Sequence, residues 1–317
     1  MTEIPELPAA VDGERITFDS NGWTLSYYLD IRAGVDETPL LLIHSINAAA
    51  SAYEVKPIYE HYQGRRAIAA IDLPGYGFSE RWSRRYTPRL MTDALHAWVE
   101  HIVERTGHQR VDALACSVAC EYLARAASER PDRYRSLALV SPVGVEPLPA
   151  SSPQETTRGR PWLYQGLCSS TSISRTLFRA LASRPSIRYF LKKTWGGSDV
   201  DKGLVDYAYT TAQQPGARHA PWSFLSGYLL SSDAADLYRR LGHPVWVAYG
   251  KRSDFADQHA RDVIADQPDA RIVAFDAGAL PHFQRPAEFF SAYDAFLNGQ
   301  LADTVEPAAG PASGSAL

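Results

Sequence analysis

The sequence contains little cysteine and no long hydrophobic run, and both absences exclude classes of protein. Only Cys116, Cys120 and Cys168 occur among 317 residues, which is too few for a disulfide framework. The longest apolar segments, such as residues 40–43, have the length of a strand, so we expect no membrane-spanning helix. The first ten residues lack the basic segment and apolar core of a signal peptide. We therefore expect a cytoplasmic protein with reduced thiols.

Positive charge is not in excess either. The chain has 32 lysines and arginines against 36 aspartates and glutamates, a formal net charge of −4. This balance argues against nucleic acid or an anionic membrane as the main partner. The sequence has no P-loop, no Rossmann glycine fingerprint and no metal-ligand cluster, so no cofactor or metal is expected. Cys116 and Cys120 have C-x3-C spacing without a nearby third ligand, and we interpret them as small buried thiols.

Short apolar segments bounded by turn residues recur along the chain and predict strands that are buried on both faces. These predicted strands are Arg15–Asp19, Thr24–Ile31, Leu40–His44, Ala67–Asp72, Val111–Ala115, Ser136–Ser141, Val245–Tyr249 and Arg271–Phe275. Between them, apolar residues spaced by three and four predict helices over Arg89–Arg105, Val118–Glu129 and Ala287–Leu297. This alternation predicts an α/β protein with a mostly parallel eight-stranded sheet and helices on both faces.

The alternation stops near Val143 and resumes near Pro244. The intervening segment predicts helices over Ile173–Ala182, Ile187–Lys193, Asp201–Thr211 and Phe224–Leu230. We interpret residues 144–241 as a helical cap inserted into a core formed by residues 14–143 and 242–300. Residues 1–13 and 302–317 are predicted to be flexible termini. Most of the many aromatic residues in this segment should form the contact between cap and core. Together they predict that the cap covers a pocket with an apolar surface.

The clearest chemical signal is the segment Ala115-Cys116-Ser117-Val118-Ala119. A short apolar strand passes straight into a helix through one serine, with a small residue two positions away on each side. That layout predicts a nucleophile elbow, a sharp turn that lifts the Ser117 hydroxyl clear of the sheet at the positive end of a helix. The usual elbow has glycines at both flanking positions, whereas this chain has alanines. The alternative is a small residue at an ordinary strand–helix turn.

Three further motifs surround the elbow in a fixed order. Residues 41–47 read L-L-I-H-S-I-N, residues 72–79 read D-L-P-G-Y-G-F-S, and residues 249–254 end a predicted strand with Y-G-K-R-S-D. With these motifs the sequence resembles the α/β-hydrolase family from about Arg15 to Leu297, the cap being the least specific part. The resemblance implies an α/β-hydrolase fold and a catalytic order of serine, acid and histidine.

The resemblance implies a role for each of several residues. Ser117 would be the nucleophile and Asp254 the acid that orients the base, while the backbone N–H groups of Ile46 and Val118 would form the oxyanion hole. Asp257 is a rival acid that could instead cap the following helix. His44 is interpreted as a structural member of its loop. Ser45 stands where the family usually has glycine, which adds a side chain beside the oxyanion hole.

The base is the uncertain member of this set. The family commonly has G-H-x-P-H in the last core loop, and its first histidine is the usual base. This chain reads Gly278-Ala279-Leu280-Pro281-His282, so Ala279 occupies the usual base position. Three explanations stay open: His282 serves as base through a shifted loop, the base is absent in nature, or Ala279 is an engineered removal. The remaining candidates, His219, His243 and His259, lie in the cap or away from strand ends.

The sequence therefore predicts a cofactor-independent, esterase-like serine hydrolase with Ser117, His282 and Asp254 as its triad. It would cleave an ester, thioester or similar acyl bond of an apolar small molecule through an acyl-serine intermediate. Two alternatives follow from Ala279: a non-hydrolytic catalyst of the lyase or cyclase type, or a ligand-binding protein on the same fold. An aspartate nucleophile, as in the epoxide hydrolases and haloalkane dehalogenases of this fold, is excluded by the serine at position 117.

Overall fold

Strands that are buried on both faces form the centre of the molecule. The computed structural model describes residues 4–31, 37–145, 157–253 and 257–299. Its strands are β1 (Glu14–Ser20), β2 (Trp23–Asp30), β3 (Leu40–Ile43), β4 (Ile68–Asp72), β5 (Val111–Cys116), β6 (Tyr134–Val140), β7 (Val245–Gly250) and β8 (Ala270–Phe275). They form one sheet in the order β1-β2-β4-β3-β5-β6-β7-β8. The pairs β1–β2 and β2–β4 are antiparallel and all others are parallel. The predicted strands and fold class are confirmed.

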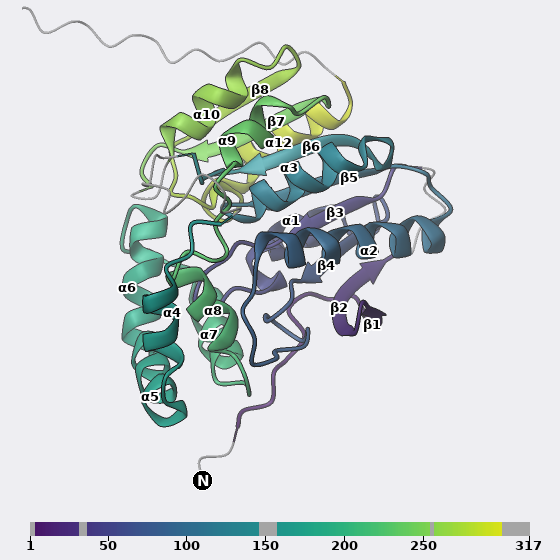
Figure 1. Ribbon diagram of the computed structural model, residues 1–317. Helices are drawn as coiled ribbons and strands as arrows, with labels where there is room; N and C mark the ends of the chain where they lie inside the picture. Colours follow the sequence, from purple (N-terminus) through teal and green to yellow (C-terminus); the bar gives the residue numbers. More distant parts are fainter. Residues whose placement is uncertain (1–3, 32–36, 146–156, 254–256, 300–317) are drawn as a thin grey trace, which may run out of the picture.

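Helices cover both faces of this sheet and extend beyond one of its ends (Figure 1). The helices are η1 (Ala52–Val55), α1 (Lys56–Tyr62), α2 (Pro88–Thr106), α3 (Ala119–Glu129), η2 (Pro131–Arg133), α4 (Pro161–Cys168), α5 (Thr171–Leu181), α6 (Arg184–Trp195), α7 (Lys202–Ala212), α8 (His219–Leu225), α9 (Ala234–Arg239), α10 (Gln258–Ala265), α11 (Pro281–Gln284) and α12 (Pro286–Leu297). No helix in the described part of the chain is both long and apolar enough to cross a membrane.

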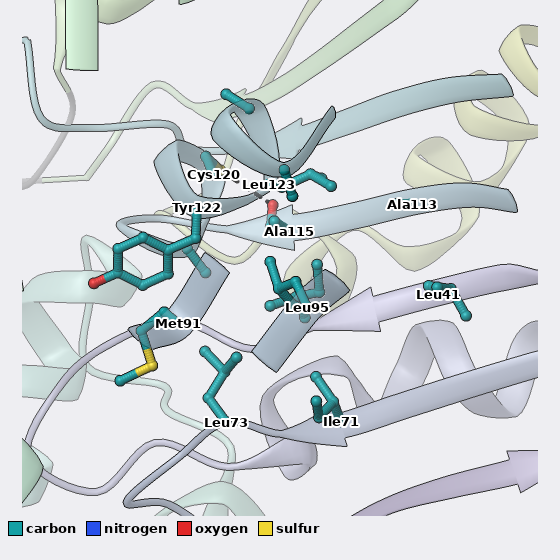
Figure 2. Packing of buried hydrophobic residues seen from close by; sticks show 14 of the residues in the cluster. Leu41, Ile71, Leu73, Met91, Leu95, Ala113, Ala115, Cys120, Tyr122 and Leu123 are labelled. Atoms are coloured by element: carbon teal, nitrogen blue, oxygen red, sulfur yellow. Dashed lines mark hydrogen bonds between the residues drawn. The ribbon is translucent and has the colours of Figure 1, made fainter. Parts of the chain in front are cut away.

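Alternate residues of each central strand enter two separate cores. Leu41 and Ile43 of β3 pack in one cluster with α2 and α3, whereas Leu40 and Leu42 pack in the other with α1 and α12. Successive side chains of a strand point to opposite faces of its sheet, so both faces need apolar residues. Figure 2 shows the first cluster, where Leu95 of α2 lies close to the strands. This packing explains why the strands were predictable as uninterrupted apolar runs.

The segment between β6 and β7 carries the predicted cap helices, with one difference of position. Helix α8 begins at His219 and ends at Leu225, so the helix predicted over Phe224–Leu230 is wrong. Pro221 lies in the first turn of α8, where proline is tolerated. Gly227, with φ +84°, lies just beyond its end in the left-handed region. Helix α9 packs against α3 and α10, and the boundaries proposed at 144 and 241 stay predictions.

Part of the segment 4–13 packs against the core, and the flexibility expected of residues 1–13 stays a prediction. Leu7, Ala10 and Val11 are buried. The Ala10 N–H donates a hydrogen bond of 3.0 Å to the Tyr28 hydroxyl, and the Tyr207 hydroxyl donates one of 2.9 Å to the Pro8 carbonyl. Burial of the apolar side chains offsets the entropy lost by ordering this segment. Residues 302–317, also predicted to be flexible, lie outside the described residues.

Candidate functional site

Ser117 occupies a left-handed turn between β5 and α3. Its φ is +53°. A non-glycine residue in this region costs about 1–3 kcal/mol and persists only where its surroundings enforce the conformation. Its own N–H donates to the Val140 carbonyl at 2.8 Å, and its carbonyl accepts from the Cys120 N–H at 3.0 Å. The side chain is partly exposed, in contrast to the buried strand before it. This geometry is that of the elbow expected from the sequence.

The small residues around Ser117 are needed because strand and helix approach closely there. Ala115 and Ala119 are completely buried. The Cys120 thiol donates a hydrogen bond of 3.2 Å to the Ala115 carbonyl (Figure 2). Burial raises the pKa of the Cys116 and Cys120 thiols well above the usual value. Both thiols therefore stay protonated, which makes them poor metal ligands and weak nucleophiles.

The predicted oxyanion donors lie on neighbouring strand ends. Strands β3 and β5 pair in parallel with Ile43 opposite Ala115, and Ile46 and Val118 each follow three residues later in the chain. Parallel neighbours end at the same edge of a sheet, so the loop after β3 runs beside the elbow. Neither the Ile46 nor the Val118 N–H donates a hydrogen bond to another described residue. The two N–H groups are therefore available in the same region as the Ser117 hydroxyl.

His44 is a structural residue of the loop after β3, as expected. It is completely buried. Its Nε2 accepts a hydrogen bond of 3.0 Å from the Leu73 N–H, so the ring proton lies on Nδ1, which donates to the Ser45 carbonyl at 2.6 Å. Burial lowers the pKa of His44 to about 4. A neutral imidazole with both nitrogens engaged cannot take a proton from Ser117.

A buried acid, Glu54, holds in place the loop after β3 that carries the predicted oxyanion donor Ile46, called the oxyanion loop below. Its Oε2 accepts from the Ser45 N–H at 2.8 Å, and its Oε1 accepts from the Asn47 side-chain amide at 2.6 Å. Asn47 also accepts from the Ala49 N–H at 2.8 Å. These bonds fix the residues on both sides of Ile46. Glu54 is 4% exposed, and burial raises the pKa of its carboxyl group.

Residues 72–79, which have the pattern D-x-P-G-x-G-x-S, pack against the same region. Asp72 is completely buried and accepts hydrogen bonds from the Ala52 N–H at 2.9 Å and the Phe78 N–H at 3.0 Å. Gly77 has φ +50°, and a Cβ added to it would lie 1.9 Å from Asp72 Cγ. The glycine is required both by the backbone conformation and by contact with the carboxylate. The motif is thus a turn that positions η1 and the oxyanion loop.

The His282 ring bonds to the backbone of Glu54 and not to Ser117. Its side chain is completely buried on α11, and its Nε2 donates a hydrogen bond of 2.8 Å to the Glu54 carbonyl. Its Nδ1 has no hydrogen-bond partner among the described residues, and burial lowers the pKa of the ring to about 4. Neither ring nitrogen bonds to Ser117. The base role expected for His282 stays a prediction, and this conformation does not provide it.

Ala279 lies in the loop where the family usually places its base. Its carbonyl accepts a hydrogen bond of 2.8 Å from the Ser141 hydroxyl, and Ser141 directly follows β6, the neighbour of β5. Its N–H donates to the Thr194 carbonyl at 2.7 Å, which ties this loop to α6. The loop therefore runs along the edge of the sheet that carries Ser117. At the usual position of the base it has the methyl group of Ala279.

The two candidate acids have different outcomes. Asp254 lies outside the described residues, so its role stays a prediction. Asp257 caps α10, since its Oδ1 accepts from the Ala260 N–H at 3.0 Å. Its Oδ2 also accepts from the Val145 N–H at 2.9 Å. The helix-capping alternative for Asp257 is confirmed.

Sequence reasoning missed two buried glutamates, Glu54 and Glu121. Glu121 lies on the first turn of α3 and accepts a hydrogen bond of 3.0 Å from the Ser231 N–H. On the same helix, the Tyr122 hydroxyl donates to the Leu229 carbonyl at 2.6 Å. Burial raises the pKa of Glu121 to about 8. Their only sequence signal is an acid inside an otherwise apolar segment, which does not reveal its partner.

The segment between β6 and β7 lies close against the loop after β3. Ala48–Ala50 and Tyr76 face Thr211, Ala212 and Ala217 across a space too narrow for a water molecule. A wider groove of about 790 Å³ lies to one side, between the N-terminal segment, the loop after the Asp72 motif and the start of α8. Its lining residues do not include Ser117.

Comparisons with known proteins agree with this geometry. A family model described as alpha/beta hydrolase fold matches residues 38–286. No curated protein sequence matches the chain significantly. Among solved structures, the fold is similar to a serine hydrolase involved in carbazole degradation, with a TM-score of 0.69 at 16% identity over 90% of this chain and 99% of that one.

Two further structures show the same similarity. The enol-lactonase from Burkholderia xenovorans LB400 has a TM-score of 0.68 at 16% identity, covering 89% of this chain and all 100% of that one. A meta-cleavage product hydrolase, CumD, has a TM-score of 0.64 at 16% identity, covering 90% and 98% of the two chains. At these identities the likeness establishes the fold.

Proposed function

Because the chain belongs to the α/β-hydrolase family, we propose that it is a cofactor-independent serine hydrolase acting on an ester, thioester or similar acyl bond of an apolar small molecule. The observation that carries this proposal is the backbone of Ser117, whose φ is +53° between a buried strand and a helix. Strain of this kind persists where the fold needs the side chain in one place. Here it holds a hydroxyl, partly exposed, at the start of α3.

The proposed reaction proceeds through an acyl-enzyme. The Ser117 oxygen attacks the carbonyl carbon of the substrate, and the resulting oxyanion accepts hydrogen bonds from the Ile46 and Val118 N–H groups. Collapse expels the alcohol or thiol and leaves an ester on Ser117, which water then hydrolyses. The bonds from Glu54 to the residues on both sides of Ile46 support this role, because they hold one oxyanion donor before the substrate arrives.

The proposed triad is completed by His282 and Asp254. For His282 to act as base, a ring nitrogen must reach the Ser117 hydroxyl, to which neither nitrogen is bonded while Nε2 lies 2.8 Å from the Glu54 carbonyl oxygen. This requirement makes His282 the residue on which the proposal is most easily tested.

A fluorophosphonate probe at neutral pH, read by intact mass, tests the nucleophile. Wild-type protein should gain one phosphonyl adduct, and Ser117→Ala should gain none. Ser128→Ala is the matched control, because Ser128 lies at the far end of α3 with its hydroxyl bonded to the Ala124 carbonyl. His282→Gln should label at least about a hundredfold more slowly if His282 is the base. A wild-type protein that is not labelled at Ser117 would refute the hydrolase proposal.

A second candidate function is favoured by Ala279 and by the bond from His282 to Glu54. Without a base, the site around Ser117 would bind an acyl compound or catalyse a non-hydrolytic step. Short-chain p-nitrophenyl esters distinguish the two functions, with bound ester measured by calorimetry and intact ester by mass spectrometry. Saturable binding with no ester loss, together with unchanged labelling in His282→Gln, would favour the second candidate.

A further inference from the structure

The cap carries a charge that the whole-chain total conceals. Between Thr157 and Ser198 the sequence contains eight arginines and lysines and no aspartate or glutamate. Six of these cations lie on α5 and α6, and all six are exposed. The rest of the chain is correspondingly acidic, which gives a net charge of −4. The argument from total charge therefore does not describe this part of the surface.

The same helices expose an unusual share of the large apolar side chains. The described residues expose nine such side chains, and five of them lie on α4, α5 and α6. These five are Trp162, Ile173, Leu177, Tyr189 and Phe190, with exposed fractions between 46% and 69%. No residue of α4 is buried. Helix α5 contacts both α4 and α6, so the exposed side chains lie on adjoining helices.

We define the cap patch as these five apolar residues together with Arg175, Arg179, Arg188, Lys192 and Lys193. Figure 1 shows α5 and α6 on the outer side of the cap, with α7 and α8 between them and the rest of the molecule. The patch therefore faces outward, at the end of the molecule that carries the cap.

The cations of the cap patch are poorly compensated by carboxylates. On α5 and α6, only Arg184 forms an ion pair within the described residues, with Asp206. Lys193 instead lies 5.3 Å above the ring of Tyr189. Burial, and then the positive charge of Arg175, lower the pKa of Arg218, which directly precedes α8, so these two cations repel one another. Anions that bind near such a surface lower its electrostatic free energy.

We propose that the cap patch docks the protein onto an anionic phospholipid bilayer. Interfacial helices combine basic residues, which attract anionic headgroups, with Trp, Phe and Leu side chains that enter the boundary between headgroups and acyl chains. Tryptophan and tyrosine favour that boundary, and each lysine or arginine near the surface adds attraction. The patch supplies both components on neighbouring helices.

Other occupants fit the patch less well. A second copy of this chain in a two-fold contact would set the same cations opposite one another without any carboxylate to pair with them. A nucleic acid would use the cations but would leave the aliphatic side chains of Ile173 and Leu177 in contact with phosphate or water. A bilayer accommodates both. This proposal rests on the surface alone and stands whether or not Ser117 is a nucleophile.

Flotation of the full-length protein with lipid vesicles tests the proposal. Vesicles of phosphatidylcholine with 30% phosphatidylglycerol should carry the protein to the top of a density gradient, and pure phosphatidylcholine vesicles should not. The double variant Lys192→Glu/Lys193→Glu should bind at least about tenfold more weakly. Ile173→Ser/Leu177→Ser should also weaken binding, and raising salt should not remove this difference.

The matched control is Arg105→Glu/Arg110→Glu, which reverses two exposed cations outside the cap and should bind like wild type. All variants are first compared by thermal melting, and only those melting within a few degrees of wild type are used. The proposal is overturned by equal binding to both kinds of vesicle, or by an equal loss in the control. It is also overturned if duplex DNA binds more tightly than vesicles, or if Ile173→Ser/Leu177→Ser only abolishes a dimer.

Discussion

Glu121 should make the stability of the protein depend on pH in a way that a single substitution removes. The carboxyl group is buried on α3, and its pKa is raised by that burial from 4.5 to about 8. Between these two values the folded protein retains a proton that the unfolded chain has released. The stabilisation is complete below the unfolded pKa and is lost as pH rises towards the folded pKa. The sign is therefore a loss of stability from mildly acidic to alkaline pH.

The size of this effect follows from the two pKa values. Each pKa unit corresponds to about 1.4 kcal/mol, so moving from pH 5 to pH 7 should reduce the contribution of this group by about 2.5 kcal/mol. Glu121→Gln keeps an oxygen that can accept from the Ser231 N–H but cannot ionise. The variant should therefore gain about 2.5 kcal/mol relative to wild type over the same interval.

Urea unfolding of both proteins at pH 5, 6, 7 and 8 measures this difference. Glu104→Gln is the control, because Glu104 is an exposed glutamate on α2, and its curve should stay parallel to wild type. A difference between Glu121→Gln and wild type that stays constant from pH 5 to pH 8 would refute the reasoning. It would mean that Glu121 is already ionised in the folded protein at pH 5.

Three further substitutions test the local geometry by urea unfolding. Ser117→Gly should stabilise the protein by about 1 kcal/mol, because glycine adopts the positive φ of the elbow without strain, while phosphonyl labelling disappears; a destabilised variant would contradict the strained turn. Gly77→Ala should destabilise by more than about 2 kcal/mol, since its Cβ would meet Asp72 at 1.9 Å; wild-type stability would show that this contact is relieved easily. Asp257→Ala should cost about 1–2 kcal/mol by removing the cap of α10, whereas Asp257→Asn, which can still cap, should cost less; equal losses would argue against capping.

The fold was predictable because its strands are buried on both faces. Residues 40–43 appear as a continuous apolar run, since alternate side chains enter different cores. The elbow was also predictable, because a strand, one serine and a helix follow one another within a few residues. The Asp257 cap has a similarly local cause, the bond from its carboxylate to an N–H three residues on. In each case the determining interactions join residues that are close in the sequence, or the determining pattern repeats along the sequence.

The features that escaped prediction depend on distant partners. The bond from His282 to the Glu54 carbonyl joins residues 228 positions apart, and nothing near either residue indicates it. The end of α8 was misplaced because Tyr228, Leu229 and Leu230 continue the apolar pattern past Leu225, whereas the helix ends before Gly227, whose φ is positive. The contacts of the N-terminal segment were not predicted because they involve Tyr28 and Tyr207, which lie far along the chain.

Two departures from the usual family pattern, at Ser45 and Ala279, concern the oxyanion loop and the base. Ser45 replaces glycine in the oxyanion loop, and its N–H is bonded to the Glu54 carboxylate. The backbone carbonyl of the same Glu54 accepts a hydrogen bond from the His282 ring. Ala279 occupies the position where the family usually has its base. Glu54 thus links the oxyanion loop to His282, which makes no hydrogen bond to Ser117. Releasing the histidine requires breaking a bond to the same short helix that anchors the loop, so base function and oxyanion geometry should be coupled in this protein.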